Sequence, residues 1–349
     1  MLIFVNREHA LHAPRQEMFR GRLVPCHEVP SRLEYVIAEL GRRPVGELRE
    51  PPPVSRTRLE RVHSRPYLDF LQGAWQEWVA QDASNEQFDV LPSVWPVRGF
   101  RHDLAPDNFA ARAGLYSFDA GTPLMAGTWR AVEAGAACAV AAATALRSPS
   151  PPRATMALTR PPGHHAGHDF FGGYCFINNA ALAAQTLRDE GCARVAVLDV
   201  DYHHGNGTQS LFYERSDVLT ISLHGDPRTE YPFYLGHADE RGAGEGKGFN
   251  LNFPLPAGTD FARWRAALMS GLERVAQFKP DALVVALGVD TYEGDPISKF
   301  KLGSRDYEQL GRDLASARLP VVFTMEGGYA VAAMGVNVVN VLEGFRAGA

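Results

Sequence analysis

The sequence has few cysteines, and none is spaced for a metal or redox site. Its 349 residues include four cysteines, Cys26, Cys138, Cys175 and Cys192. No two of them form a C-x-x-C pair, which disfavours a cysteine zinc site and a dithiol redox motif. A disulfide framework is also not expected in a chain of this length.

The chain also has no long apolar run and no block of basic residues. No segment approaches the ~20 apolar residues needed to span a bilayer. The net charge is −5, which argues against nucleic acid as the main partner. The apolar start at residues 1–5 is shorter than the apolar core of a signal peptide. We therefore expect a cytoplasmic protein whose partners include no nucleic acid and no membrane.

Several catalytic motifs are missing as well. The sequence contains no H-E-x-x-H and no G-x-S-x-G. Residues 242–248 are rich in glycine, but Lys247 is followed by Gly248 instead of serine or threonine, which excludes a P-loop and indicates a flexible loop. What the sequence does contain is twelve histidines, several of them in adjacent pairs.

Short apolar runs alternate with helical patterns along the chain. The runs lack polar alternation, which is typical of strands buried on both faces, and cover residues 2–5, 154–158, 195–200, 218–223, 282–287 and 321–325. Helical patterns cover residues 31–40, 128–146, 177–190, 259–278, 304–317 and 330–345. This alternation predicts an α/β fold with a parallel sheet, helices on both faces, and a single domain over residues 1–349.

Two local features of this pattern make specific predictions. Ser31 and Glu34 have the spacing of a capping box, and Gly41 is placed to end the helix that they begin. Residues 81–126 fit no helix or strand pattern and predict a long irregular segment. Such segments are usually functional or bound to a partner. The alternative is a surface loop packed by its own aromatic side chains.

Polar residues follow the apolar runs, where the carboxyl ends of parallel strands bind ligands. Asp201 and His203 are two residues apart on an extended segment, so their side chains point the same way, and Asp290 follows another strand. Three protein ligands leave a position open, as in catalytic zinc sites. Two carboxylates and one imidazole also suit ferrous iron. The alternative is that Asp201 caps a helix and His203 is an ordinary loop histidine.

Other residues at these strand ends favour a hydrolase. His164 and His165 are adjacent, and histidine is well suited to proton transfer near neutral pH. Asp199 is placed to hold the second nitrogen of a histidine. Tyr329 follows two glycines and can donate a hydrogen bond to a developing oxyanion, although a tyrosine in a surface turn is the alternative.

Six motifs follow one another along the chain: R-P-P-G-H-H-A, G-G-Y-C-F-I-N-N-A, V-L-D-V-D-Y-H-H-G-N-G-T, I-S-L-H-G-D-P, L-G-V-D-T-Y-E-G-D-P and M-E-G-G-Y. Together they resemble those of the zinc-dependent histone deacetylase superfamily, and most closely its bacterial acetylpolyamine amidohydrolase branch. The resemblance covers nearly the whole chain. It implies an arginase/deacetylase fold with a central, mostly parallel eight-stranded sheet.

The resemblance also implies a role for each matching residue. Zinc would be bound by Asp201, His203 and Asp290, and a structural potassium ion by residues Asp199, Asp201, His203, Ser222 and Leu223. His165 would act as general base and then as general acid, with His164 as its neighbour. Tyr329 would polarise the acetyl carbonyl. Asn206 would partner His165, and a neutral partner leaves that imidazole less biased toward its cation.

The same resemblance implies a substrate and an assembly. Gly173, Tyr174 and Tyr231 match positions that line a narrow channel, although aromatic core packing is the alternative. Glu17 matches an acid near the channel entrance that attracts a distant ammonium group. The long segment 81–126 would form a homodimer, or a higher homo-oligomer, whose partner narrows the site.

The second entrance acid of that branch has no counterpart in this sequence. Counting back without gaps from Gly127 places Ala110 at its position. Asp107 and Asp119 lie nearby in the sequence as possible substitutes.

We therefore predict a metal-dependent amidohydrolase that removes acetyl groups from small acetylated amines. A broader acyl-amide or acetyl-lysine deacetylase is the alternative within enzymes. An arginase-like enzyme would need D-x-H-x-D, whereas Gly205 stands where the last aspartate would be. A non-catalytic sensor is disfavoured by the full set of candidate catalytic residues.

Overall fold

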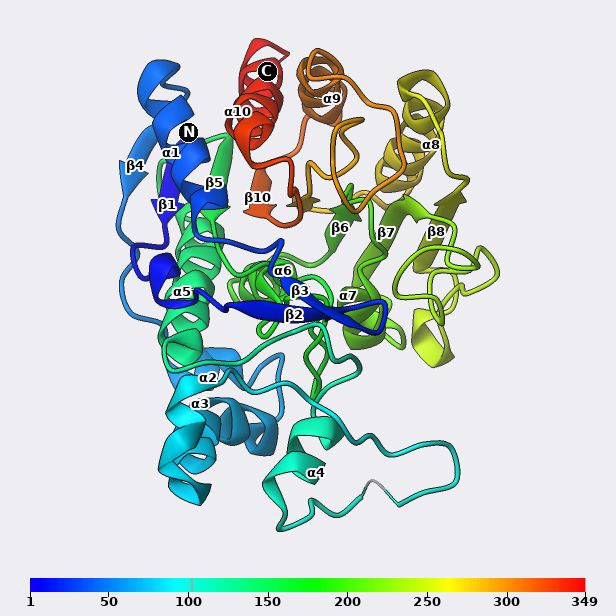
Figure 1. Ribbon diagram of the computed structural model, residues 1–349. Helices are drawn as coiled ribbons and strands as arrows, with labels where there is room; N and C mark the ends of the chain where they lie inside the picture. Colours follow the sequence, from blue (N-terminus) through cyan, green and yellow to red (C-terminus); the bar gives the residue numbers. More distant parts are fainter. Residues whose placement is uncertain (102, 349) are drawn as a thin grey trace.

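The computed structural model describes residues 1–101 and 103–348, so His102 and Ala349 of the predicted domain lie outside the described residues. A sheet of eight strands forms its centre, in the order β4-β1-β5-β10-β9-β6-β7-β8, and all of its strand pairs are parallel (Figure 1). The strands are β1 (Leu2–Val5), β4 (Glu47–Arg49), β5 (Ala154–Leu158), β6 (Val195–Asp199), β7 (Val218–Gly225), β8 (Asn250–Leu255), β9 (Ala282–Leu287) and β10 (Val321–Met325). The predicted parallel eight-stranded sheet is confirmed.

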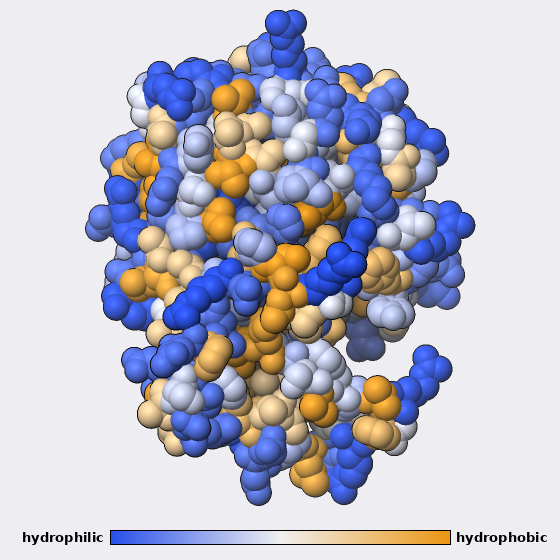
Figure 2. Space-filling view, in the orientation of Figure 1, coloured by the Kyte–Doolittle hydropathy of each residue, from blue (hydrophilic) through white to orange (hydrophobic). Residues whose placement is uncertain are grey.

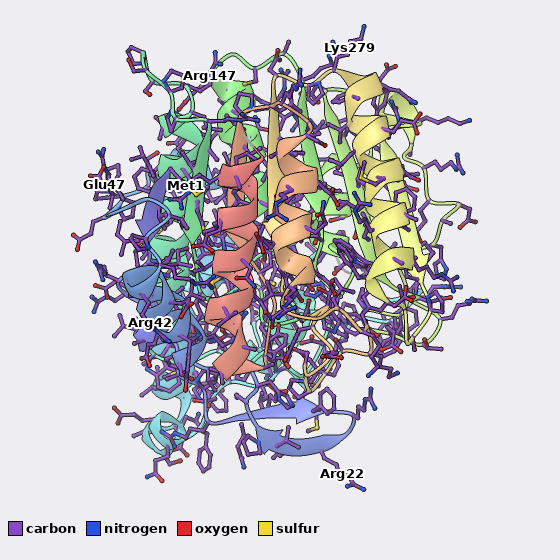
Figure 3. All side chains as sticks on the ribbon, turned by 90° about the horizontal axis from the view of Figure 1, so that it is seen from above. Met1, Arg22, Arg42, Glu47, Arg147 and Lys279 are labelled. Atoms are coloured by element: carbon purple, nitrogen blue, oxygen red, sulfur yellow. The ribbon has the colours of Figure 1, made fainter. Side chains whose placement is uncertain are left out.

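Helices cover both faces of the sheet because its strands are apolar on both sides. In β9, Leu283 and Leu287 join one buried cluster, whereas Val284 and Ala286 join the other. The first cluster includes side chains of α1 (Ser31–Arg42), α8 (Phe261–Phe278), α9 (Asp306–Ala315) and α10 (Val331–Ala347). Helices α8, α9 and α10 lie side by side in Figure 3. The second includes side chains of α3 (Arg65–Gln81), α4 (Phe109–Leu115), α5 (Thr128–Ala145), α6 (Asn179–Asp189) and α7 (Asn206–Phe212).

The predicted capping box at the start of α1 is wrong. The helix already begins at Ser31, Pro30 occupies the N-cap in a helical conformation, and no side chain caps it. The carbonyl groups of Val29 and Pro30 accept the first backbone hydrogen bonds instead. Gly41 does not end this helix either, because α1 continues to Arg42.

Residues 81–126 are less irregular than predicted. They contain a short 3-10 helix, η2 (Ala83–Gln87), and α4. Phe109 and Tyr116 are buried, with ring centroids 6.1 and 5.0 Å from that of Phe70 on α3. These aromatic contacts tie α4 to the body of the protein, so part of the segment belongs to the second core cluster.

An antiparallel hairpin, β2 (Gln16–Phe19) and β3 (Arg22–Pro25), was not predicted. It lies across the front of the molecule in Figure 1, and its turn residues Arg20 and Gly21 have φ angles of 50° and 81°. The remaining elements are α2 (Arg56–Leu59), η1 (His9–Leu11) and η3 (Gly244–Gly246). Across the residues that the structure describes, none of the helices combines the length and the apolar character that crossing a membrane requires.

Candidate active site

The carboxyl ends of neighbouring strands carry the predicted functional residues. His164 and His165 follow β5, Tyr329 follows β10, Asp290 follows β9, and the segment 199–206 follows or ends β6. Because β5, β10, β9, β6 and β7 are adjacent in the sheet, these side chains meet at one edge. All of them are buried.

Asp201, His203 and Asp290 form a group able to hold a metal ion. One atom from each lies within 4.8 Å of the others. His203 Nδ1 is 3.0 Å from Asp290 Oδ2 and 3.4 Å from Asp201 Oδ1. Gly327 N donates to the other oxygen of Asp201, and Tyr202 N donates to the other oxygen of Asp290. The backbone thus aims one oxygen of each carboxylate at the imidazole.

Electrostatics also favours a cation at this group. Burial, and then the charge of Asp201, raise the pKa of Asp290 to about 8. Burial alone would lower the pKa of His203, but its hydrogen bonds and charge contacts with both aspartates raise it to about 10. Both groups hold protons more tightly than usual because the buried carboxylates attract positive charge, and a divalent cation would take the place of those protons. The donor set therefore fits a divalent metal.

Glycine is required beside these carboxylates. A Cβ atom at Gly288 would lie 2.0 Å from Asp201 Oδ2. At Gly327, it would lie 2.5 Å from the same oxygen and 2.6 Å from Asp290 Oδ2. Because both positions lack a side chain, the backbone can approach the carboxylates of Asp201 and Asp290 closely.

His164 and His165 lie side by side, with ring centroids 4.0 Å apart, and each has its own partner. His164 Nδ1 is 2.8 Å from Asp199 Oδ2, and His165 Nδ1 is 2.6 Å from Asn206 Oδ1. The amide oxygen of Asn206 can only accept, so it fixes the proton of neutral His165 on Nδ1 and leaves Nε2 with a free lone pair.

The two histidines differ in charge preference. Burial alone would lower the pKa of His164, but the charge of Asp199 raises it to about 10. Burial, and then the charges of His164 and His203, lower the pKa of His165 well below its usual value. This places a cationic His164 next to a neutral His165.

Glu326 fixes the loop that carries these histidines, and sequence reasoning gave it no role. It is fully buried, and its Oε2 accepts from the backbone N–H groups of Gly163, at 2.7 Å, and His164, at 3.0 Å. Burial raises the pKa of its carboxyl to about 7. Its position directly after a buried strand was the available signal.

Tyr329 is held by residues that the sequence did not indicate. Its backbone N–H donates to Asp295 Oδ2 at 2.7 Å. The guanidinium of Arg32, on α1, lies 4.8 Å from the centroid of its ring and donates to the carbonyl oxygens of Gly328, at 2.7 Å, and Glu326, at 2.5 Å. Arg32 carries no sequence signal because it occupies an ordinary helical position.

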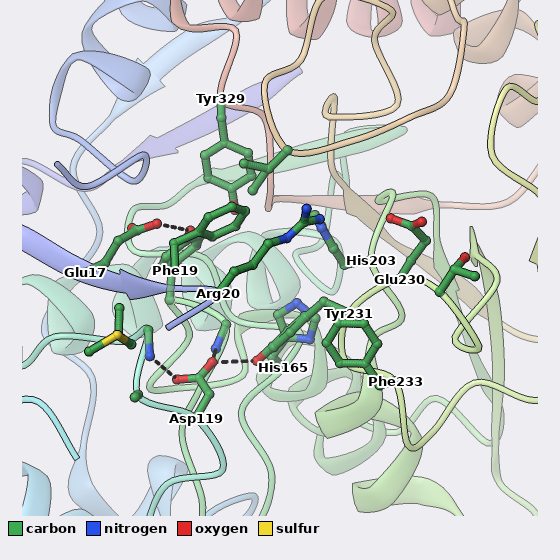
Figure 4. A pocket seen from close by; sticks show the side chains of 17 residues that line it. Glu17, Phe19, Arg20, Asp119, His165, His203, Glu230, Tyr231, Phe233 and Tyr329 are labelled. Atoms are coloured by element: carbon green, nitrogen blue, oxygen red, sulfur yellow. Dashed lines mark hydrogen bonds between the residues drawn. The ribbon is translucent and has the colours of Figure 1, made fainter. Parts of the chain in front are cut away.

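A cavity of about 320 Å³ opens above these groups (Figure 4). Among the predicted residues, Glu17, His165, Gly173, Tyr174, His203, Tyr231 and Tyr329 line it. The remaining predicted catalytic and metal residues, His164, Asp199, Asp201, Asn206 and Asp290, are buried behind this lining. On the face of the molecule drawn in Figure 2, a band of apolar residues runs down the middle between hydrophilic ones.

One of the two possible substitutes that the sequence offered for the missing entrance acid lies in the cavity wall. Asp119 lines the cavity, whereas Asp107 and Ala110 do not. Arg20, from the turn of the unpredicted β2–β3 hairpin, also lines it and is labelled at its mouth in Figure 4. Local sequence gave no signal for Arg20, because the hairpin reaches the cavity only through the tertiary fold.

The predicted potassium residues also lie together, behind the cavity. Asp199 and Ser222 are register partners on β6 and β7, and Leu223 follows on the same strand. Ser222 Oγ lies 2.8 Å from His224 Nδ1 and 3.3 Å from His204 Nδ1. Ser222 is thus a hydrogen-bond partner of His204 and His224, two further histidines of the sequence.

The fold and this site together define an α/β protein with a candidate three-ligand metal site and two adjacent histidines beneath one cavity. A family model described as the histone deacetylase domain matches residues 26–345. The chain therefore belongs to the histone deacetylase family.

Its relatives carry more specific names. The chain is 50% identical over 350 residues to acetylpolyamine amidohydrolase 1 of Pseudomonas aeruginosa, with 100% of both chains covered. It is 43% identical over 344 residues to acetylpolyamine amidohydrolase of Mycoplana ramosa, with 99% of both covered. The crystal structure of acetylpolyamine aminohydrolase from Burkholderia pseudomallei superimposes with a TM-score of 0.94 at 39% identity, covering 100% of this chain and 99% of that one.

Proposed function

We propose that this protein is a metal-dependent amidohydrolase that removes acetyl groups from acetylpolyamines and yields acetate and the free amine. The observation that carries the proposal is that His165, His203 and Tyr329 face one narrow cavity. Relatives similar over their full length are named for the same reaction. The proposed substrate is a slender alkyl amine because aromatic side chains and Gly173 form the cavity wall.

Asp201, His203 and Asp290 are the proposed ligands of a zinc ion, with ferrous iron as the alternative. Such a metal, when bound, supplies Lewis-acid activation of a water molecule and of the acetyl carbonyl. The residues Asp199, Asp201, His203, Ser222 and Leu223 are the proposed holders of a structural potassium ion.

The protein's own residues perform the proton transfers. His165 accepts a proton at Nε2 from the attacking water, whose oxygen bonds to the acetyl carbon. The Tyr329 hydroxyl donates a hydrogen bond to the carbonyl oxygen as negative charge develops there. The C–N bond then breaks, and His165 returns its proton to the leaving nitrogen. Asp199 and Asn206 keep the two imidazoles oriented.

A substrate panel tests the proposed function. We expect zinc-loaded or iron-loaded enzyme to hydrolyse N-acetylputrescine and N-acetylspermidine with a kcat/KM at least about tenfold above that for acetyl-lysine peptides. Initial rates of acetate release measure this. Equal rates on all substrates would favour the broader deacetylase, and a failure to hydrolyse any amide would contradict the proposal.

Glu17 predicts a pH dependence that is specific for cationic substrates. Burial raises the pKa of its carboxyl to about 7, against hydrogen bonds from Tyr174 and the backbone of His27. Asp119 and Glu28 are the other charged groups that act on it, and Arg20 lines the same cavity. Glu17 becomes anionic as the pH rises through 7. The kcat/KM ratio of N-acetylputrescine to its neutral isostere N-pentylacetamide should therefore rise about tenfold between about pH 6 and pH 8.

The matched variant is Glu17→Gln, which keeps the size and removes the charge. We expect the ratio of the two substrates to become independent of pH in this variant. Dividing the two rates cancels titrations that affect the chemistry itself. A wild-type ratio that stays flat would show that Glu17 does not attract the ammonium group.

We further propose that a second copy of the chain covers the segment 81–126. Its side chains Val94, Val97 and Leu104 are 59%, 59% and 62% exposed, an unusual gathering of apolar surface. Val97→Asp should convert a dimer to a monomer in sedimentation velocity, whereas Val336→Asp, at an exposed position on α10, should not. A wild-type protein that sediments as a monomer would refute this.

A further inference from the structure

Asp119 joins three loops around the cavity. Its Oδ2 accepts from the backbone N–H of Gly173, at 2.8 Å, and from the hydroxyl of Tyr231, at 2.7 Å, while its Oδ1 accepts from the N–H of Gly121, at 3.1 Å (Figure 4). Three of the roughly four acceptor positions of a carboxylate are therefore filled by the protein. Hydrogen bonds to a charged carboxylate are among the stronger ones, so this residue ties the loops firmly.

Two of the groups held by Asp119 press against His165. The ring of Tyr231 stands at 90° to the imidazole, with centroids 5.2 Å apart. Gly173 has a φ of 55°, and a Cβ atom there would lie 2.2 Å from His165 Cδ2. The backbone of Gly173 is thus packed directly on the imidazole, and a shift of either group would move it.

The residue before Asp119 reinforces this arrangement. The ring of Phe118 stacks on Tyr231 at 5.9 Å and lies 6.4 Å from the ring of His165. Phe118 therefore packs against the cavity wall, and Asp119 holds Tyr231 and Gly173 of that wall through hydrogen bonds. Asn206 holds Nδ1 of the imidazole, whereas the packing of Tyr231 and Gly173 on its ring depends on the position of Asp119.

We propose that Asp119 is a positioning residue for hydrolysis: it holds Tyr231 and the Gly173 turn against His165, and it does not serve as a receptor for the substrate's distal ammonium group. This inference rests on the proposed function, because it assigns a role in the same reaction. It separates Asp119 from Glu17, which is left as the group that senses substrate charge. The third acid that lines the cavity, Glu230, accepts a hydrogen bond from Lys299 Nζ.

The test compares Asp119→Asn, Tyr231→Phe and the double variant on N-acetylputrescine and N-pentylacetamide. A positioning role predicts that Asp119→Asn lowers kcat about 10–100-fold on both substrates, leaving their kcat/KM ratio within about twofold of the wild-type value. Tyr231→Phe keeps the ring and should cost about 3–10-fold. The kcat of the double variant should be no lower than that of Asp119→Asn alone, because both changes break the same hydrogen bond between Tyr231 and Asp119.

Three controls keep the outcomes distinct. Asp281→Asn removes an acid outside the cavity, just before β9, and should leave kcat unchanged. Glu17→Gln should change the substrate ratio, which Asp119→Asn should not. Thermal unfolding shows whether a variant is merely destabilised: a lower melting temperature with unchanged kcat would overturn the inference. A loss confined to N-acetylputrescine would also overturn it and identify Asp119 as an ammonium receptor.

A measurement without turnover decides the inference even when the proposed function fails. If the wild-type enzyme hydrolyses neither substrate, the ¹H–¹³C resonances of the His165 ring still report the packing of Tyr231. We expect Asp119→Asn and Tyr231→Phe to shift these resonances and Asp281→Asn to leave them in place. Unchanged resonances in Asp119→Asn would overturn the inference.

Discussion

Replacing His165 with alanine is expected to lower kcat for acetylpolyamine hydrolysis by about 10²–10⁴-fold, the range typical of a lost general acid–base group. The imidazole lines the cavity, its Nδ1 is occupied by Asn206 at 2.6 Å, and its Nε2 is the atom left to exchange protons. The alanine variant has no group in this place to take the proton from water or to return it to the amine. Steady-state rates of acetate release measure the loss.

The matched control is His168→Ala. His168 follows the dyad by only a few residues, but its Nδ1 faces the carbonyl of Val62 at 2.9 Å and its side chain does not line the cavity. We expect its kcat to stay within about twofold of the wild-type value. A His165→Ala enzyme that kept more than about a tenth of the activity would rule out His165 as the general base.

Asp290→Ala should weaken metal binding more than the loss of a group that only supports a ligand through a hydrogen bond. It removes one of the three proposed ligands and leaves Asp201 and His203 alone at the site. Changes in outer partners of metal ligands typically cost 10–100-fold in affinity, so we expect the loss of a ligand to exceed about 100-fold. Metal content per chain and competition with a chelator measure it, and hydrolysis should fall in parallel.

Asp281→Asn is the corresponding control, because Asp281 stands just before the opposite end of the same strand, β9, and its carboxylate accepts from the backbone N–H of Arg194. It should keep the wild-type metal content. If Asp290→Ala bound one metal per chain with wild-type affinity, the proposed site would be wrong.

The sheet was predictable where burial is continuous. The runs at 154–158, 282–287 and 321–325 became β5, β9 and β10 with those bounds, because both faces of each strand are covered. The edge strands β4 and β8 gave weaker signals. All three residues of β4 are exposed, and β8 carries Asn250 and Asn252 among its apolar side chains. An edge strand pairs with another strand on one side only and is less buried, so its composition is less constrained.

The candidate ligands and dyad were predictable for a different reason. Asp201 and His203 lie on one short segment, and His164 and His165 are adjacent, so local spacing already determines that their side chains act together. Parallel strands also bring their carboxyl ends to one edge, which places Asp290 and Tyr329 beside them.

The sequence by itself therefore determined the parallel sheet, the candidate metal ligands and the pair of adjacent histidines, because strand burial and residue spacing are local properties. Only the tertiary structure decided how these groups are enclosed. Asp119 reaches Tyr231 across 112 residues, and Arg32 reaches Gly328 across 296. Contacts over such separations depend on how whole elements pack, and no periodicity or motif in either segment indicates its partner.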